Sequence, residues 1–180
     1  MTTDNDPVIL VNAADAEMGT ADKLDAHRRG LKHRAISVLV RNKDGMLLLQ
    51  RRSAGKYHSG GLWANACCSH PLPGEDEAAA ARRRLKQEMG VDCALVPMFV
   101  TQYRAVVSDG LIEDEVVHVF AGTFDGPVHP DRAEASEWKW IALAELEGDI
   151  GARPEQYAVW FRHYLSVHRP LIARWAAGAN

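Results

Sequence analysis

Short apolar runs separated by polar or turn-forming segments fill the first third of the chain, which is the pattern of strands joined by turns. Residues 8–11 are apolar and predict a short strand, and a polar stretch that carries His27 follows them. Two further apolar runs, at residues 35–40 and 46–50, surround an Asn-Lys-Asp-Gly segment at residues 42–45. Because Asp-Gly between apolar runs is a strong hairpin signal, we predict a β-hairpin here.

An alanine-rich segment at residues 75–89 gives the clearest helix signal. Its first turn is acidic and its later half is basic, which matches the helix dipole, and Gly90 suits the left-handed position that ends a helix. The preceding residues 51–73 are rich in Gly, Ser, Pro and Cys and predict mostly loop, with residues 63–67 extended.

The second half of the chain predicts further strands. We expect them at residues 94–99, 101–107, 115–124 and 138–141, with a turn at residues 108–110.

Two helical segments follow these strands. Residues 143–146 predict a short helix, and Pro154 opens a longer one. Four large side chains share one face of this longer helix: Tyr157, Trp160, Phe161 and Tyr164. Pro170 breaks or restarts it before residues 171–175.

Strands mixed with a few helices, without strict alternation, predict an α+β fold. The expected form is an α/β/α sandwich in which helices flank a mixed central sheet. No repeat or low-complexity linker divides the 180 residues. We therefore expect a single domain over residues 1–180, with its core at about 8–168.

Composition narrows the possible partners. Hydrophobic residues make up 47% and charged residues 25%, which is ordinary for a globular protein, and a net charge of −3 gives no reason to expect nucleic acid. No apolar run approaches the ~20 residues of a membrane span, and the polar first six residues do not resemble a signal peptide. Three cysteines, two of them adjacent, suit a reducing compartment. We expect a cytoplasmic monomer.

Three histidines and two glutamates from distant segments offer a set of metal ligands: His27, His33, His70, Glu113 and Glu115. Each has an ordinary interpretation when taken alone, as a solvated histidine, a turn before Pro71 or an exposed carboxylate. Alternation along a strand nevertheless places the two glutamates on one side. A mixed nitrogen and oxygen set suits Zn²⁺, Mn²⁺ or Mg²⁺ and argues against Ca²⁺.

Five segments occur in a characteristic order along the chain: residues 23–33, Arg51-Arg52, Gly-Leu-Trp-Ala-Asn-Ala-Cys-Cys-Ser-His-Pro at 61–71, Gln-Tyr-Arg-Ala at 102–105 and Glu-Asp-Glu-Val at 113–116. Together they resemble type I isopentenyl-diphosphate isomerases, which are relatives of the Nudix hydrolases. The resemblance runs from about Val8 to beyond Trp160. It implies a Nudix-like fold for the whole domain.

The Nudix signature itself is altered. That family expects Gly, five residues, Glu, seven residues and then Arg-Glu-apolar-x-Glu-Glu-x-Gly. Here Ser69 takes the place of the leading glycine, Arg84 and Gln87 replace two acidic residues, and Glu88 alone remains of that acidic trio. Nudix hydrolases hold Mg²⁺ with this cluster, so diphosphate hydrolysis is disfavoured.

The resemblance implies the interconversion of isopentenyl diphosphate and dimethylallyl diphosphate in isoprenoid biosynthesis. A proton added at one carbon gives a tertiary carbocation, and another proton leaves the neighbouring methylene. Cys68 matches the catalytic cysteine on one face of the substrate, and Glu115 with Tyr103 serves the opposite face. Which of them donates the proton stays open. Trp160 matches an aromatic residue that faces the cation, although its helical spacing fits a core residue equally well.

The resemblance also implies the ligands of the site. The substrate diphosphate is bound by four cations: Lys23, Arg52, Lys56 and Arg84. A divalent metal, Mn²⁺ or Mg²⁺ with Zn²⁺ also compatible, is bound by three histidines and two glutamates: His27, His33, His70, Glu113 and Glu115. A Mg²⁺ that arrives with the substrate is held by Glu88 and a backbone carbonyl near Cys68. Two other interpretations stay open, an ordinary Nudix diphosphate hydrolase and a non-catalytic metal-binding module.

Overall fold

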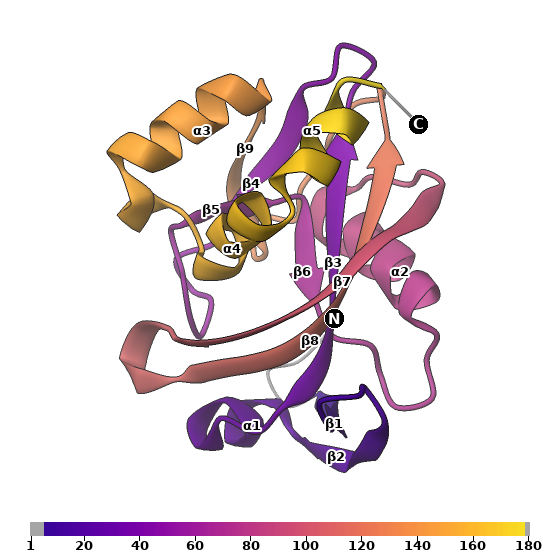
Figure 1. The fold of residues 1–180 in the computed structure, drawn as a ribbon, viewed down its shortest axis with the longest axis vertical. Coiled ribbons are helices and arrows are strands. Elements are labelled where there is room, and N and C mark those ends of the chain that lie inside the picture. Colours follow the sequence, from indigo (N-terminus) through magenta and orange to yellow (C-terminus); the bar gives the residue numbers. More distant parts are fainter. Residues whose placement is uncertain (1–5, 179–180) are drawn as a thin grey trace.

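A mixed sheet forms the middle of the computed structural model, which describes residues 6–178 (Figure 1). Within these residues the sheet has nine strands, and helices pack on both of its faces. This arrangement confirms the predicted α+β class and the layered order. The expectation about a signal peptide depends on the first six residues, and residues 1–5 lie outside the described part. None of the described helices combines the length and the apolarity that crossing a membrane requires.

The chain begins with a hairpin and a helix that sequence analysis predicted only in part. β1 (Pro7–Val11) matches the predicted strand, and it pairs with β2 (Glu17–Asp22) before α1 (Lys23–Arg29), which carries His27. β2 was missed because it is exposed along nearly its whole length and so shows no alternation. α1 was missed because two turns offer too few positions to reveal a helical period.

β3 (His33–Arg41) lies at the centre of the sheet and is buried along most of its length. It pairs in parallel with β8 (Ile112–Thr123) and antiparallel with β6 (Cys67–Ser69). The register places His33 beside Glu115 and Ser37 beside Cys68. Side chains from three distant segments thereby meet on one strand.

The predicted hairpin at residues 42–45 is right only at its turn. Hydrogen bonds within the turn form as expected, but β3 and β4 (Leu47–Arg52) pair only at Arg41 and Leu47. β4 pairs along its length with two other strands, β5 (Trp63–Asn65) and β9 (Ala135–Ile141). The two strands diverge because β6 occupies the edge of β3 that a hairpin partner would take.

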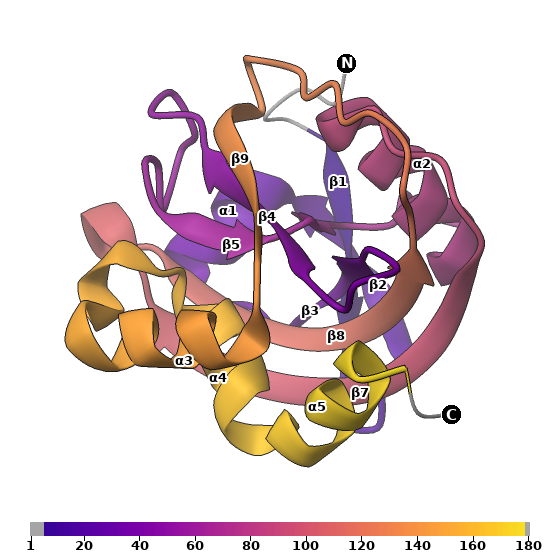
Figure 2. The ribbon, with the colours of Figure 1, turned by 90° about the horizontal axis from the view of Figure 1, so that it is seen from above.

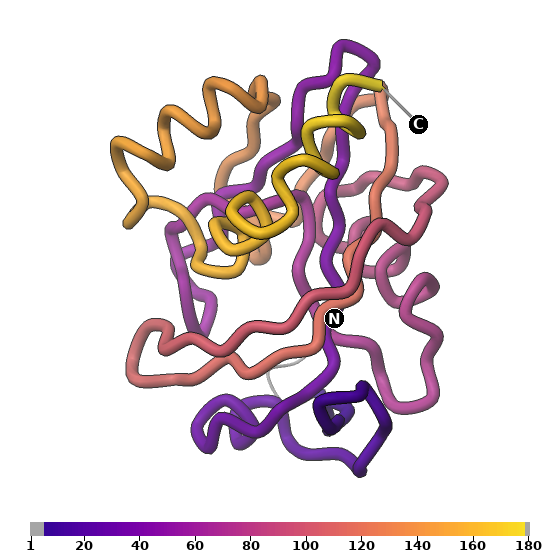
Figure 3. Tube along the Cα trace, viewed as in Figure 1, coloured from indigo at the N-terminus to yellow at the C-terminus, as the bar shows by residue number. Residues whose placement is uncertain are grey.

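A long curved ribbon of β7 (Leu95–Val106) and β8 crosses the molecule (Figures 1 and 2). The strands predicted at 94–99 and 101–107 are one strand with an irregularity between Pro97 and Phe99. The turn predicted after them is a 3₁₀ turn, Ser108–Gly110. Figure 3 follows the chain from the indigo N-terminal hairpin, below this ribbon, to the yellow C-terminal helices above it.

The sheet lies between two apolar cores, and helices cover each core on its outer side. α2 (Glu77–Met89) covers one face, and the other is covered by α3 (Leu143–Ala152), α4 (Val159–Val167) and α5 (Arg169–Ala176). Alternation along β3 divides its side chains between them. Ile36 and Val38 join the core beneath α2, whereas Ala35 and Leu39 join the core beneath the C-terminal helices.

The C-terminal helices begin elsewhere than predicted. Pro154 opens a 3₁₀ turn, Pro154–Gln156, and α4 starts only at Val159, so Tyr157 lies in extended backbone before the helix. α3 is longer than the predicted four residues. Pro170 restarts the chain in the first turn of α5, as the sequence indicated.

The end of α2 gives a test of this fold. Gly90 is left-handed (φ 66°), and a Cβ there would lie 2.6 Å from the carbonyl oxygen of His129. We expect Gly90→Ala to lower the free energy of unfolding by about 2 kcal/mol or more, because alanine is strained at this φ and the neighbouring backbone must move. Urea unfolding measures the loss.

Gly148→Ala is the matched control, because Gly148 lies inside α3 with open space where its Cβ would be. This change should raise stability by about 0.5–1 kcal/mol. Equal stability of Gly90→Ala and the wild type would contradict the expectation.

Candidate functional site

A cavity opens between α1, the loop after β4, β6, the β7–β8 ribbon and α4. Most residues predicted as functional from the sequence line it: Lys23, Arg52, Lys56, Cys68, His70, Arg84, Tyr103, Glu113, Glu115 and Trp160. The other three, His27, His33 and Glu88, are buried directly behind these lining residues. The fold therefore gathers the whole predicted set in one place.

Backbone carbonyls fix the orientation of two histidines. Nδ1 of His27 lies 2.7 Å from the Lys23 carbonyl oxygen, and Nδ1 of His33 lies 2.7 Å from that of Leu31. A carbonyl only accepts, so Nδ1 donates in both rings and each Nε2 keeps its lone pair. Such outer contacts are typical of histidines that bind metals.

Three imidazoles and one carboxylate converge on a small volume. The ligand atoms of His27, His33, His70 and Glu115 all lie within 4.8 Å of one another. Oε1 of Glu115 is 3.2 Å from Nε2 of His70 and 3.3 Å from Nε2 of His33. The last contact sets a ring lone pair against a carboxylate oxygen, and this Nε2 has no hydrogen-bond partner among the described residues. A shared cation would turn the contact into joint ligation.

Glu113 joins this cluster through a phenol. The hydroxyl of Tyr103 lies 2.8 Å from Oε2 of Glu113 and 2.8 Å from Oε2 of Glu115, and the two glutamates alternate onto the same side of β8. Burial and repulsion from Glu115 raise the pKa of Glu113 well above its usual value. Burial opposes ionisation of Glu115 too, but contacts with His33 and His70 hold its pKa well below the usual value. Burial and mutual repulsion therefore oppose the presence of two negative charges on the carboxyl pair.

These donors fit a divalent metal. They are buried or partly buried, and they combine imidazole nitrogen with carboxylate oxygen, a set that is compatible with Zn²⁺, Mn²⁺ or Mg²⁺ and argues against Ca²⁺. A bound cation would favour ionisation of both carboxyl groups, which burial opposes.

Cys68 holds its thiol in a hydrogen-bonded niche beside the cluster. Its Sγ lies 2.9 Å from Oγ of Ser37 and 3.3 Å from Oδ1 of Asn65. Burial raises the pKa of Cys68 to about 12, although the Ser37 contact lowers it. The thiol therefore stays protonated at neutral pH. Cys67 belongs to the opposite core, beneath α2, because adjacent residues of a strand point to opposite faces of the sheet.

Trp160 satisfies both interpretations that the sequence allowed. It is 2% exposed within the core beneath the C-terminal helices, and it also lines the cavity. The guanidinium of Arg52 lies 5.2 Å from the centre of its ring. The face of the Trp160 ring therefore already lies against a positive charge, that of Arg52.

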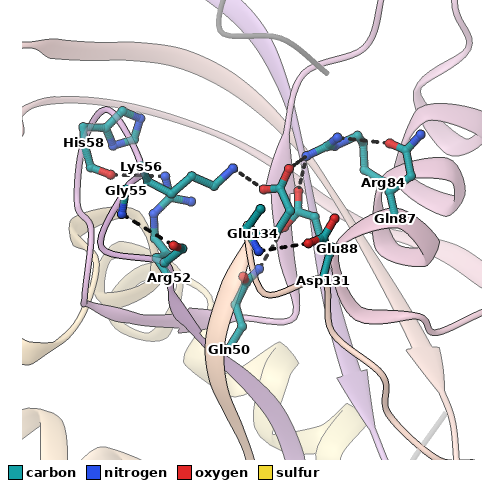
Figure 4. A network of polar contacts seen from close by, with 12 residues as sticks. Gln50, Arg52, Gly55, Lys56, His58, Arg84, Gln87, Glu88, Asp131 and Glu134 are labelled. Carbon is teal, nitrogen blue, oxygen red and sulfur yellow. Dashed lines mark hydrogen bonds and ion pairs between the residues drawn. The ribbon is translucent and has the colours of Figure 1, made fainter. Parts of the chain in front are cut away.

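Two of the predicted diphosphate ligands share a carboxylate. Lys56 and Arg84 both contact Glu134, and Arg84 also reaches Oε1 of Glu88 at 2.8 Å (Figure 4). Gln50 donates to the other oxygen of Glu88 at 2.9 Å. The cations are thereby held at one end of the cavity, where an anion would meet them.

Sequence reasoning missed His58 and Glu134. His58 is buried in a Gly- and Ser-rich segment that was read as loop, and its Nε2 lies 3.4 Å from Oε1 of Glu113. Burial, with the charges of Arg52 and His27, lowers the pKa of His58 to about 2. Glu134 follows a stretch without periodicity. Neither residue carried a pattern that could have distinguished it from a surface residue.

Comparison with known proteins identifies the family of this chain. The NUDIX domain family matches residues 31–164. Isopentenyl-diphosphate Delta-isomerase 2 of Aromatoleum aromaticum is 56% identical over 157 residues, which cover 86% of this chain and 82% of that protein. The Isopentenyl-diphosphate Delta-isomerase of Burkholderia multivorans is 45% identical over 170 residues, or 94% and 97% of the two chains.

Solved structures support the fold alone, because their sequences are distant. The crystal structure of DR0079 from Deinococcus radiodurans has a TM-score of 0.69 at 19% identity and covers 82% of this chain and 90% of that one. The Nudix hydrolase RenU of M. smegmatis has a TM-score of 0.57 at 18% identity, with 92% and 94% covered. By the matched domain and by these relatives, the chain belongs to the NUDIX family and, within it, to the isopentenyl-diphosphate Delta-isomerases.

Proposed function

We propose that this protein interconverts isopentenyl diphosphate and dimethylallyl diphosphate. The observation that carries the proposal is the position of the Cys68 thiol, which lines the same cavity as the hydrogen-bonded pair of Tyr103 and Glu115. The relatives named isopentenyl-diphosphate Delta-isomerase, at 45–56% identity over most of the chain, support the same reaction.

The reaction moves a proton onto one carbon of an alkene and takes another proton from the adjacent methylene. An unactivated alkene is a weak base, so the acid must be held against it where water is excluded. Cys68 serves one face of the substrate, and Glu115 with Tyr103 serves the other. One group donates and the other accepts, and positioned proton transfer of this kind contributes about 10²–10⁴-fold to the rate.

Trp160 stabilises the carbocation between these two steps. A cation over a desolvated indole face gains about 2 kcal/mol. Arg52 already makes such a contact with this ring. A positive centre that forms beside this ring therefore meets an electron-rich surface.

The charged ends of the cavity bind the diphosphate and the metals. Lys23, Arg52, Lys56 and Arg84 are the proposed diphosphate ligands, and all of them line the cavity. Glu88 and the backbone near Cys68 would hold a Mg²⁺ that accompanies the substrate, since Mg²⁺ prefers one or two carboxylates together with phosphate oxygens.

The second metal is Mn²⁺ or Mg²⁺, with Zn²⁺ also compatible, and its proposed ligands are His27, His33, His70, Glu113 and Glu115. When bound it supplies a fixed positive charge that keeps Glu115 ionised. The chain's own donors do the rest: they hold the carboxylate beside the Tyr103 hydroxyl.

Diphosphate hydrolysis fits the geometry less well. Arg84 replaces a carboxylate of the Nudix acidic cluster, and it forms a buried ion pair with Glu88. A cation at this position opposes the tight Mg²⁺ site that activates water in Nudix hydrolases.

We further infer that residues 1–180 act as one domain, as a monomer and in the cytoplasm. The support is one continuous sheet through the described residues and three cysteines that are all free. The proposed ligands are small diphosphates rather than macromolecules.

Removing the Cys68 thiol tests the chemistry. We expect Cys68→Ser and Cys68→Ala to lower turnover of isopentenyl diphosphate by at least about 10²-fold, because neither side chain supplies the proton-transfer group. Conversion to the allylic product is followed by chromatography, and thermal melting checks that both variants fold. Cys67→Ala is the control, since Cys67 faces the opposite core and should keep its activity. Near-normal turnover without the Cys68 thiol would refute its role.

Removing divalent metal tests the cluster. Dialysis against a chelator should abolish turnover and lower the melting temperature, because an ion held at 100 times its dissociation constant stabilises the fold by about 2.7 kcal/mol. Mn²⁺ or Mg²⁺ added back should restore both properties. Full activity in protein whose metal content is zero by mass spectrometry would rule out a functional metal.

A further inference from the structure

His58 is a fourth buried imidazole at the metal cluster, and no step of the isomerisation uses it. It lies in the loop between β4 and β5 and is 5% exposed. Its ring stacks on His27 with 5.4 Å between centroids and meets Trp160 edge-on at 5.9 Å. Its carbonyl accepts a hydrogen bond from Arg52, so the loop backbone is fixed as well (Figure 4).

Two groups of close donor atoms in the described chain share His27. One group adds His33, His70 and Glu115, and the other adds His58 and Glu113. Because Nδ1 of His27 donates to the Lys23 carbonyl, this ring offers one lone pair, on Nε2. One lone pair binds one ion. If both groups bind metal, they must therefore share one ion.

We propose that His58 is a ligand of this metal and completes a shell of six donors: His27, His33, His58, His70, Glu113 and Glu115. The proposal rests on the proposed function only because it concerns the same metal centre.

The contact between His58 and Glu113 repeats the contact between His33 and Glu115. In both pairs Nε2 faces a carboxylate Oε1, at 3.4 Å and 3.3 Å, a distance that is long for a hydrogen bond. Nδ1 of His58 lies 3.2 Å from Oγ of Ser59 and can donate to it, which leaves a lone pair on Nε2. A cation held between the nitrogen and the oxygen would account for the long distance in both pairs.

Six protein donors have a chemical consequence. An octahedral ion with no open position binds no water, so it can hold charge without generating a nucleophile beside the carbocation. A six-donor shell rich in imidazole also favours a transition metal such as Mn²⁺ over four-coordinate Zn²⁺ and over Mg²⁺, which prefers oxygen.

Cobalt binding to the complete chain tests the proposal without substrate. Co²⁺ is titrated into metal-free wild type, His58→Gln and His58→Ala, with affinity measured by calorimetry and coordination by visible absorption. Glutamine keeps an amide N–H that can donate to Glu113 but is a poor metal ligand, and alanine keeps neither. We expect both variants to bind Co²⁺ at least about tenfold more weakly and to absorb more intensely than wild type, as a shell reduced from six donors does. His129→Gln, which removes an exposed imidazole, is the control.

Three results would overturn the proposal. The first is affinity and absorption equal to wild type in both variants. The second is weaker binding in His58→Ala alone, which would make His58 an orienting donor to Glu113 and not a ligand. X-ray absorption of Mn²⁺-loaded wild type is the third measurement and needs no variant: fewer than four imidazoles at the ion exclude His58. If the isomerase activity failed instead, Co²⁺ binding would be unaffected, so the two failures are distinguishable.

Discussion

The burial of ionisable side chains is the constraint on which this site depends. Two carboxyl groups and several imidazoles lie in one wall of a cavity, and ionised groups in such a place are costly unless they are paired. The protein meets this cost with positioned partners: backbone carbonyls for His27 and His33, and the Tyr103 hydroxyl for both glutamates. Nε2 of His33 keeps no hydrogen-bond partner among the described residues, and it lies against the Glu115 carboxylate together with Nε2 of His70, which is the arrangement that a cation would stabilise.

The sheet determines which side chains meet there. β3 pairs with β6 on one edge and with β8 on the other, so Cys68 and Glu115 come from strands that share a neighbour. The period of two along each strand then separates the cavity from the core beneath α2. Adjacent cysteines illustrate it: Cys67 packs beneath α2, and Cys68 lines the cavity. A shift of one residue in register would exchange them and bring the wrong sulfur to the substrate.

The sequence predicted what depends on local rules and missed what depends on partners. Helix α2 was identified almost to the residue because alanine content, charge bias and Gly90 agree with one another. The β3–β4 pairing was predicted wrongly, because a turn signal is local whereas the competition from β6 is not. The candidate site was gathered through family resemblance, since spacing alone could not show that the residues converge. His58 escaped because an imidazole in a glycine-rich loop has no pattern until the fold buries it.

The Nudix scaffold also explains how one helix can support different chemistry. Nudix hydrolases hold Mg²⁺ with several carboxylates, so the ion belongs to the protein and can activate water. Here Arg84 neutralises the one retained carboxylate, Glu88, at 2.8 Å, and Lys56 with Glu134 extends the ion pairs toward the cavity. A single carboxylate is enough for a Mg²⁺ that arrives with diphosphate oxygens, because this ion keeps most of its shell from substrate and water. Under the proposed function, the helix would therefore bind the charged end of the substrate, and the thiol, the phenol and the indole would face the reacting carbons.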